Sequence, residues 1–161
     1  MTIQVGDKLP DGKFLTMTDD GPALTTVSEL TSGKKVVLFA VPGAFTPTCH
    51  ANHLPGFIDN ADAIKERGVD EIAVVSVNDV HVVNAWAEAT KGKGKITFLA
   101  DGNADFAKSI GMDKDLSVAH MGIRSLRYSM IVEDGVVTAF HAGDGPGQAS
   151  IASAAAILEK L

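Results

Sequence analysis

The chain contains a single cysteine, Cys49, and the residues around it favour a reactive thiolate. It lies in the segment VPGAFTPTCH (41–50), with Thr46 three positions before it and His53 four positions after it. Thr46 suits the N-cap of a helix and Pro47 suits its first turn, so Cys49 is expected in that turn. Unpaired N–H groups and the helix dipole stabilise an anion there. The segment is therefore a candidate site for thiolate chemistry.

Several other interpretations of this thiol stay open from the residues alone. A lone cysteine is most often a small buried hydrophobe. Dithiol exchange would need a second cysteine, and Thr46 occupies the place where that cysteine usually stands. His50 and His53 could join Cys49 at a metal, but the chain has no other thiol ligand and we expect no metal. A cysteine hydrolase would need a base, and the remaining histidines are scattered at His81, His120 and His141.

The overall composition fits one globular domain, residues 1–161, and narrows the function classes. Hydrophobic residues make up 45% of the chain and charged residues 21%, which is typical of a protein with a substantial core. The formal net charge of -6 argues against nucleic acid as a partner, because phosphate backbones would be repelled. No apolar run reaches the ~18 residues that span a bilayer, so we expect no membrane segment. The lack of a signal-peptide pattern and the single cysteine favour the cytoplasm.

Three continuous apolar runs predict strands that are covered on both faces of a sheet. They are KVVLFAV (35–41), EIAVVSV (71–77) and ITFLA (96–100). The runs YSMIVED and VVTAFHA flank Asp134-Gly135, which is a strong signal for a β-hairpin. The first 34 residues are rich in turn-forming residues and contain the short extended piece KFLTM, so they predict an N-terminal hairpin and loops.

Helical periodicity fills the intervals between these strands. After the first strand, one apolar helix face is made of Leu54, Phe57, Ile58, Ala61 and Ile64. Pro55 predicts a kink or a fresh start near His53 and Leu54, and Gly68 ends this helix. Further helices are predicted at 79–89, capped by Asn78 or Asp79, and at 104–110, stopped by Gly111. A closing helix in 150–161 is expected to place on one face Ile151, Ala154, Ala155, Leu158 and Leu161.

The order of these elements indicates an α/β fold with a mixed central sheet flanked by helices. Strand–helix alternation builds a parallel part, and the later hairpin adds an antiparallel part. A β-α-β unit followed by a β-β-α unit is the thioredoxin-like arrangement, here with an N-terminal hairpin and an inserted strand and helix at 96–110. Cys49 then follows the carboxyl end of a central strand, where α/β sheets place their sites.

The segment around the cysteine resembles the P-x-x-x-T-x-x-C signature of the peroxiredoxins, with Pro42, Thr46 and Cys49 at the fixed positions. Further stretches resemble the atypical, type II (peroxiredoxin-5-like) group, which includes plant cytosolic enzymes and the mammalian mitochondrial one. They are VGDKLPD, HLPGF, SVND, LADG and GIRSLRYSMIVEDG. The similarity runs from about residue 3 to the end of the printed sequence.

The resemblance implies a thiol peroxidase that reduces hydrogen peroxide and alkyl hydroperoxides. It gives Cys49 the role of the peroxidatic thiolate, which becomes a sulfenic acid. It gives Thr46 the role of the hydroxyl that binds thiolate and peroxide, and Arg127 the role of the arginine that returns to the site. Pro42 would shield the thiolate from water, and the N–H groups of Gly43 and Cys49 would be further donors to the peroxide. Arg124 fits either a supporting group or a solvated side chain.

A lowered thiol pKa would supply little of the rate. A free thiol with a pKa of about 8.5 is only ~3% thiolate at neutral pH, so a pKa of about 6 raises the thiolate about 30-fold. Nucleophilicity falls with pKa at a slope of ~0.4–0.5, which costs about tenfold and leaves a net gain of about threefold. Most of the acceleration would then come from donors aimed at the two oxygens, a task that suits the permanently charged fork of Arg127.

This sequence departs from many relatives because it has no second cysteine. Val74 and Ser150 stand where such relatives carry a resolving thiol. The resemblance therefore implies a one-cysteine mechanism in which glutathione, glutaredoxin or thioredoxin reduces the sulfenic acid. A disulfide between two copies of Cys49 is the other formal option. Type II relatives form dimers near the active-site loop, with Phe45 as a candidate contact. A peroxide sensor and a thioredoxin-fold binding module are the competing interpretations.

Overall fold

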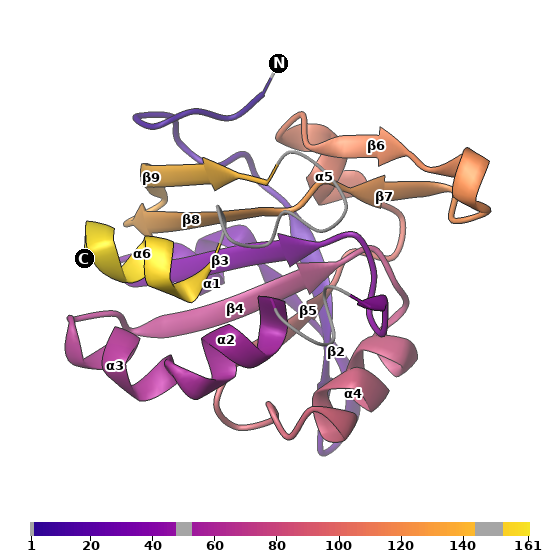
Figure 1. Cartoon of the computed structure of the whole chain (residues 1–161), viewed down its shortest axis with the longest axis horizontal. Helices are drawn as coiled ribbons and strands as arrows, with labels where there is room; N and C mark the ends of the chain where they lie inside the picture. The colour runs from indigo at the N-terminus through magenta and orange to yellow at the C-terminus, as the bar shows by residue number, and fades with distance from the viewer. Residues whose placement is uncertain (1, 48–52, 144–152) are drawn as a thin grey trace.

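A seven-stranded mixed sheet forms the centre of the molecule, in a computed structural model that describes residues 2–47, 53–143 and 153–161 (Figure 1). The strands lie in the order β2-β1-β5-β4-β3-β8-β9. Their bounds are β1 Lys13–Thr18, β2 Gly21–Thr26, β3 Lys35–Val41, β4 Glu71–Ser76, β5 Thr97–Ala100, β8 Tyr128–Glu133 and β9 Val136–Ala142. The three apolar runs and the two predicted hairpins are thus confirmed.

Parallel strands occupy the middle of the sheet and antiparallel strands its two sides. β4 pairs in parallel with β3 and with β5. β8 runs antiparallel to β3, and β1 runs antiparallel to β5. Asp134 and Gly135 both have positive φ, 48° and 83°, as the two central residues of a type I′ hairpin turn require.

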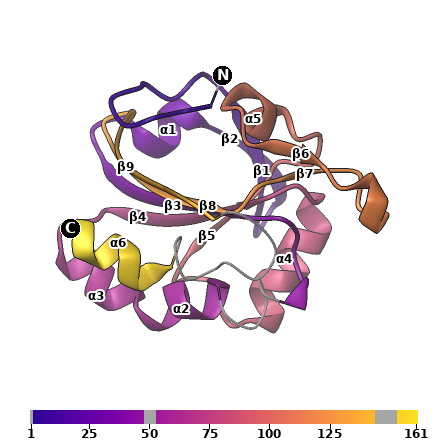
Figure 2. The ribbon, with the colours of Figure 1, turned by 45° about the horizontal axis from the view of Figure 1, so that its top comes forward.

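Helices cover both faces of the sheet and create two cores (Figure 2). One face carries α2 (Leu54–Asp59), α3 (Ala61–Glu66), α4 (Val80–Ala89) and α6 (Ala154–Lys160), and the other carries α1 (Val27–Thr31) and α5 (Asp105–Ser109). The first core includes Phe39, Phe57 and Trp86, and the second includes Phe106 and Tyr128. Both faces of the middle strands are therefore buried, which explains their uninterrupted apolar sequences.

The irregularity predicted near His53 and Leu54 falls where α2 begins, at Leu54, with Pro55 in the first turn where a missing N–H costs nothing. The break that follows was not predicted. Asn60 leaves helical geometry at φ -100° and ψ 7° and separates α2 from α3. Its Nδ2 donates to the carbonyl oxygen of Gly56 at 2.8 Å. A local hydrogen bond of this kind competes with the helix and explains the break.

The predicted apolar face of the last helix is partly wrong. α6 begins after Ser153, whose hydroxyl caps the N–H of Ala156. Ala154 and Ile157 are buried, whereas Ala155 is exposed. Ile151 lies outside the described residues. Leu158 and Leu161 pack against the core as predicted, and Ile157, which was not predicted, is buried in it. The buried face of the helix is therefore rotated toward Ile157.

Two short features were absent from the sequence prediction. α1 is only five residues long, yet it starts at a complete capping box formed by Thr26 and Glu29. A two-stranded arm, made of β6 (Asp113–Asp115) and β7 (Ile123–Ser125), projects from the sheet, and the 3-10 helix η2 (Ser117–Ala119) closes its tip (Figure 1). Each strand has three residues, too few for an alternating pattern to be recognised. None of the described helices is long and apolar enough to cross a membrane.

Candidate active site

The loop that follows β3 carries three of the predicted site residues: Pro42, Gly43 and Thr46. The Thr46 hydroxyl donates to the carbonyl oxygen of Gly43 at 2.8 Å, and its N–H donates to the same oxygen at 3.4 Å. The N–H of Ala44 donates to Oδ1 of Asn78, beyond the end of β4, at 2.9 Å. The loop is thus tied both to itself and to the neighbouring strand, which fixes its path at the carboxyl edge of the parallel strands.

Thr46 can fill only part of the role that the sequence suggested. Because a backbone oxygen only accepts, the hydroxyl proton of Thr46 is directed at Gly43. While that bond persists, the same oxygen has lone pairs with which to accept a hydrogen bond from a peroxide. Phe45 lies between Gly43 and Thr46 in the sequence. It has a φ of 64°, an unusual value for a bulky residue, and it is 47% exposed.

The predicted nucleophile, Cys49, lies outside the described residues, together with Thr48, His50, Ala51 and Asn52. The expectation that it occupies the first turn of a helix stays a prediction. Thr46 and His53, on either side of it in the sequence, are described and delimit the place where it must lie.

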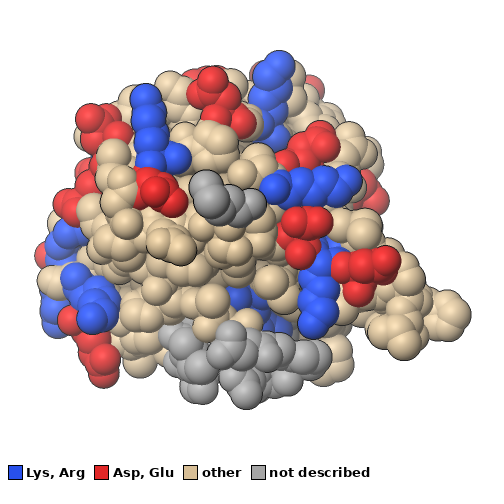
Figure 3. All heavy atoms as spheres, turned by 90° about the horizontal axis from the view of Figure 1, so that it is seen from above, with Lys and Arg blue, Asp and Glu red and all other residues tan. Residues whose placement is uncertain are grey.

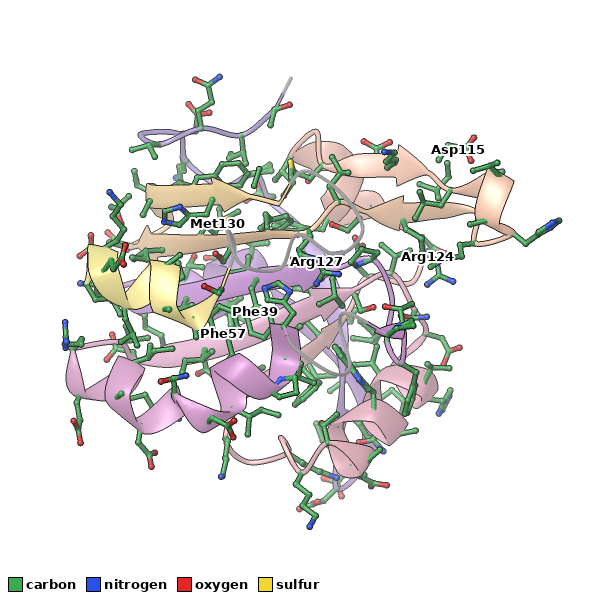
Figure 4. The ribbon with its side chains drawn as sticks, in the orientation of Figure 1. Phe39, Phe57, Asp115, Arg124, Arg127 and Met130 are labelled. Carbon is green, nitrogen blue, oxygen red and sulfur yellow. The ribbon has the colours of Figure 1, made fainter. Side chains whose placement is uncertain are left out.

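Arg127 is brought to this site by the pairing of β8 with β3. The two strands are antiparallel, with Ala40 opposite Tyr128, so the residue before Tyr128 lies at the carboxyl end of β3 where the loop begins. Arg127 is only 3% exposed, and one of its terminal nitrogens, Nη1, lies 2.8 Å from Nδ1 of His53. Figure 4 shows Arg127 on the same side of the sheet as Phe39 and Phe57. The structure therefore brings the predicted arginine to His53, one of the two residues that delimit the thiol.

The contact of His53 with Arg127 was not predicted from the sequence. His53 is 2% exposed and immediately precedes α2. Its ring lies edge-on to Phe39 at 5.1 Å and to Phe57 at 5.5 Å, and those two rings stack on each other at 3.9 Å. The apolar rings hold the imidazole in one orientation, and its Nδ1 faces the guanidinium. The hydrogen bond spans 74 positions of sequence, so no local pattern could have revealed it.

The contact between His53 and Arg127 fixes the tautomer of the imidazole. A guanidinium has only donors, so Nδ1 must accept and cannot carry a proton. The ring is therefore neutral, with its proton on Nε2. This use of Nδ1 also removes one nitrogen from the metal site considered above. No group of three or more His, Cys, Asp or Glu residues within the described part of the chain could hold a metal ion.

Arg124 also reaches the loop, which answers the question that the sequence left open. Its Nε donates to the carbonyl oxygen of Met121 at 2.8 Å, and its Nη1 donates to that of Pro42 at 3.4 Å. In Figure 4 it lies further out than Arg127, beneath β7. Arg124 is therefore half-buried against the loop and is not a solvated side chain. Two arginines thus reach the ends of this loop, and their charged N–H groups are suited to oxygen atoms that gain negative charge.

Comparison with known proteins identifies the family. A family model described as Redoxin matches residues 4–158. Peroxiredoxin-2C of Oryza sativa subsp. japonica is 46% identical over 160 residues, which cover 99% of this chain and 98% of that protein. The chain belongs to the peroxiredoxins. Its other relatives include a chloroplastic and a mitochondrial peroxiredoxin of Arabidopsis thaliana, at 43% and 42% identity over 89% and 85% of this chain.

Solved structures agree with this assignment. The crystal structure of reduced Prx3 from Vibrio vulnificus, in complex with hydrogen peroxide, superposes with a TM-score of 0.94 at 46% identity and covers 99% of both chains. The Plasmodium falciparum antioxidant protein, a 1-Cys peroxiredoxin, gives a TM-score of 0.90 at 29% identity over 98% of both chains. The predicted thioredoxin-like fold and the resemblance to the type II, peroxiredoxin-5-like group are both confirmed. This peroxiredoxin is a thiol peroxidase with an antioxidant activity.

Proposed function

We propose that this peroxiredoxin, a single domain over residues 1–161, uses a one-cysteine mechanism. The Cys49 thiolate attacks one oxygen of a hydroperoxide, the O–O bond breaks, and the other oxygen leaves as water or an alcohol with the proton of the attacked oxygen. Cys49 is left as a sulfenate, which takes up a proton from water to become a sulfenic acid. A first glutathione thiol condenses with it, releasing water and forming a mixed disulfide, and a second thiol from glutathione or glutaredoxin restores Cys49. Thioredoxin is the alternative reductant.

Arg127 carries most of the transition-state stabilisation in this proposal. Charge builds on both oxygens as the bond breaks, and a fixed cationic fork stabilises it without reorganisation. Thr46 accepts a hydrogen bond from the peroxide, the N–H of Gly43 donates one, and Pro42 shields the thiolate from water. The observation that carries the proposal is the buried hydrogen bond between Arg127 and His53 at 2.8 Å. It aims a guanidinium at the region delimited by Thr46 and His53.

The test compares peroxide with a reagent that needs no oxygen donors. In Arg127→Ala the second-order rate constant with hydrogen peroxide should fall by at least about 100-fold, as it does when an oxyanion donor is removed. Alkylation of Cys49 by iodoacetamide at the same pH should change far less. Arg67→Ala, which removes an exposed arginine, is the matched control and should leave both rates unchanged. An unchanged peroxide rate in Arg127→Ala would refute the assignment.

The reductant is tested separately. Mass spectrometry after one equivalent of hydrogen peroxide, followed by glutathione, should detect one glutathione adduct, and Cys49→Ser should show none. Steady-state turnover is then compared with glutathione, glutaredoxin and thioredoxin. If thioredoxin alone supports turnover and no adduct forms, glutathione is not the reductant. If none of the three supports turnover, the proposed one-cysteine cycle with these reductants is wrong.

We also propose that the protein is a cytoplasmic homodimer. The single cysteine suits a reducing compartment. Near the active-site loop, Phe45 is 47% exposed, and Val118 at the tip of the arm is 93% exposed. The outer end of the arm, at the right of Figure 3, carries no Lys, Arg, Asp or Glu, whereas charges of both signs are mixed over the rest of that face. Exposed apolar side chains on an uncharged surface are typical of an interface.

Sedimentation velocity tests the dimer. Val118→Asp should raise the dissociation constant at least tenfold, because a buried unpaired carboxylate opposes association. Val5→Asp places the same charge on another exposed valine and should leave the dissociation constant unchanged. A wild-type protein that sediments as a monomer at micromolar concentration would refute the proposal.

A further inference from the structure

The peptide group between Pro42 and Gly43 is held from its carbonyl side by Arg124. Nη1 of Arg124 donates to the Pro42 oxygen at 3.4 Å, while Nε of the same side chain is anchored on Met121 at 2.8 Å. A peptide group is planar, and no cis bond occurs among the described residues. A bond to the oxygen therefore fixes the direction of the N–H on the opposite edge, and that N–H belongs to Gly43.

The other polar groups of this loop already have partners within the protein. The Gly43 oxygen accepts from Thr46, and the N–H of Ala44 donates to Asn78. Gly43 is buried, yet its own N–H donates to no residue that the structure describes. Buried N–H groups almost always have an acceptor. Within the described part of the chain this donor is therefore available to a ligand, and its direction is set by the arginine behind it.

Gly43 is also the point at which the arginine comes closest to the loop. A Cβ atom added to Gly43 would lie 2.7 Å from Nη1 of Arg124 and 3.1 Å from Cγ2 of Thr46. Glycine thus lets the guanidinium rest against the peptide. A cation bound to a carbonyl oxygen also polarises the peptide, which strengthens the N–H as a donor.

We propose that Arg124 is a positioning residue for the peroxidase reaction. It acts through the Pro42–Gly43 peptide, whose N–H it orients and polarises toward the oxygens of the hydroperoxide. The inference rests on the function proposed above. As the thiolate attacks, the electron pair of the O–O bond moves to the leaving oxygen, which takes the proton of the attacked oxygen. The Gly43 N–H then stabilises the charge on these oxygens, and Arg124 itself touches no reacting atom.

The first experiment removes the cation from the arm. Arg124→Met should lower the second-order rate constant with hydrogen peroxide about tenfold, less than loss of an oxyanion donor, because the donor stays but is poorly aimed. Alkylation of Cys49 by iodoacetamide should stay within twofold of wild type. Lys114→Met is the matched control. Lys114 is exposed and lies opposite Arg124 across the arm, and its substitution removes the same charge. It should leave both rates within twofold of wild type.

The second experiment is a double-mutant cycle with Gly43→Ala. The added Cβ should push the guanidinium aside, because the atom it meets is the end of a flexible side chain. Gly43→Ala alone should lower the peroxide rate, and adding Arg124→Met to it should change that rate less than twofold. This non-additivity is the signature of two residues that act through one contact.

Three results would overturn the inference. In the first, Arg124→Met matches Lys114→Met in its peroxide rate. In the second, its alkylation rate falls as far as its peroxide rate, which indicates general damage to the loop. In the third, the effects of Gly43→Ala and Arg124→Met add fully. These results require a wild-type enzyme that turns over peroxide. A wild-type protein without turnover refutes the proposed function and this inference with it.

Discussion

The hydrogen bond between His53 and Arg127 gives the sharpest prediction for this enzyme. Removing the imidazole in His53→Ala takes away the acceptor that holds Nη1 of the guanidinium at 2.8 Å. A hydrogen bond to a charged group contributes ~1.5–3 kcal/mol, and each 1.4 kcal/mol is a factor of about ten in rate. If the whole contribution is lost in the transition state, the second-order rate constant with hydrogen peroxide falls about 10- to 100-fold. Substitution of an exposed side chain, such as Arg67→Ala, should by comparison leave this rate constant unchanged.

A matched substitution separates the effect of losing the hydrogen-bond acceptor from the effect of losing the packing of the ring. His53→Gln keeps an acceptor, because the amide oxygen can receive the bond from Nη1, but it carries no titratable ring. It should recover most of the peroxide rate that His53→Ala loses. Both variants also disturb the Phe39–Phe57 pair, so thermal unfolding and iodoacetamide alkylation of Cys49 are measured alongside. Equal peroxide rates in the two variants would show that the acceptor does not matter.

Three further predictions concern stability. Burial, with a smaller effect of Lys160, lowers the pKa of His141, so the unfolded chain binds more protons below about pH 6.5. The free energy of unfolding in urea should fall from pH 7.5 to pH 5.5, and less steeply in His141→Gln. Burial raises the pKa of Tyr128, the sole tyrosine, so tyrosinate absorbance should appear only together with the fluorescence change of Trp86 on alkaline unfolding. Thr26→Ala removes the hydroxyl that caps α1 and should cost ~1 kcal/mol by urea denaturation, whereas Thr25→Ala should cost less.

The sequence predicts the elements that obey a strong local rule. Apolar runs such as 71–77 mark strands because both of their faces are buried, and Asp134-Gly135 marks a hairpin because its backbone needs positive φ. The arm formed by β6 and β7 obeys no such rule. Its strands are short and largely exposed, and they are held by pairing with each other and by contacts such as that of Arg124 with the loop.

The residues of the candidate site also divide into those that a local motif identifies and those that only tertiary contacts reveal. Pro42, Thr46 and Cys49 stand within eight positions, so a motif can identify them. Arg127 was found through family resemblance, since nothing in its local sequence says which loop it meets. His53 was considered only as a metal ligand, because its partner lies 74 positions away. The roles of His53 and Arg124 depend on tertiary contacts, and these appear only once the strands are paired.

The pairing of β8 explains why a distant arginine can be aimed so closely. Side chains alternate along this strand. Tyr128, Met130 and Val132 enter one core, while Ile131 enters the other. Arg127 shares the parity of Ile131 and so points to the face that carries α2 and His53. A shift of one residue in the β3–β8 register would turn Arg127 to the wrong face and expel Tyr128 from its core. The buried aromatic ring therefore opposes the slip, and the packing of one core sets the direction of the guanidinium on the other side of the sheet.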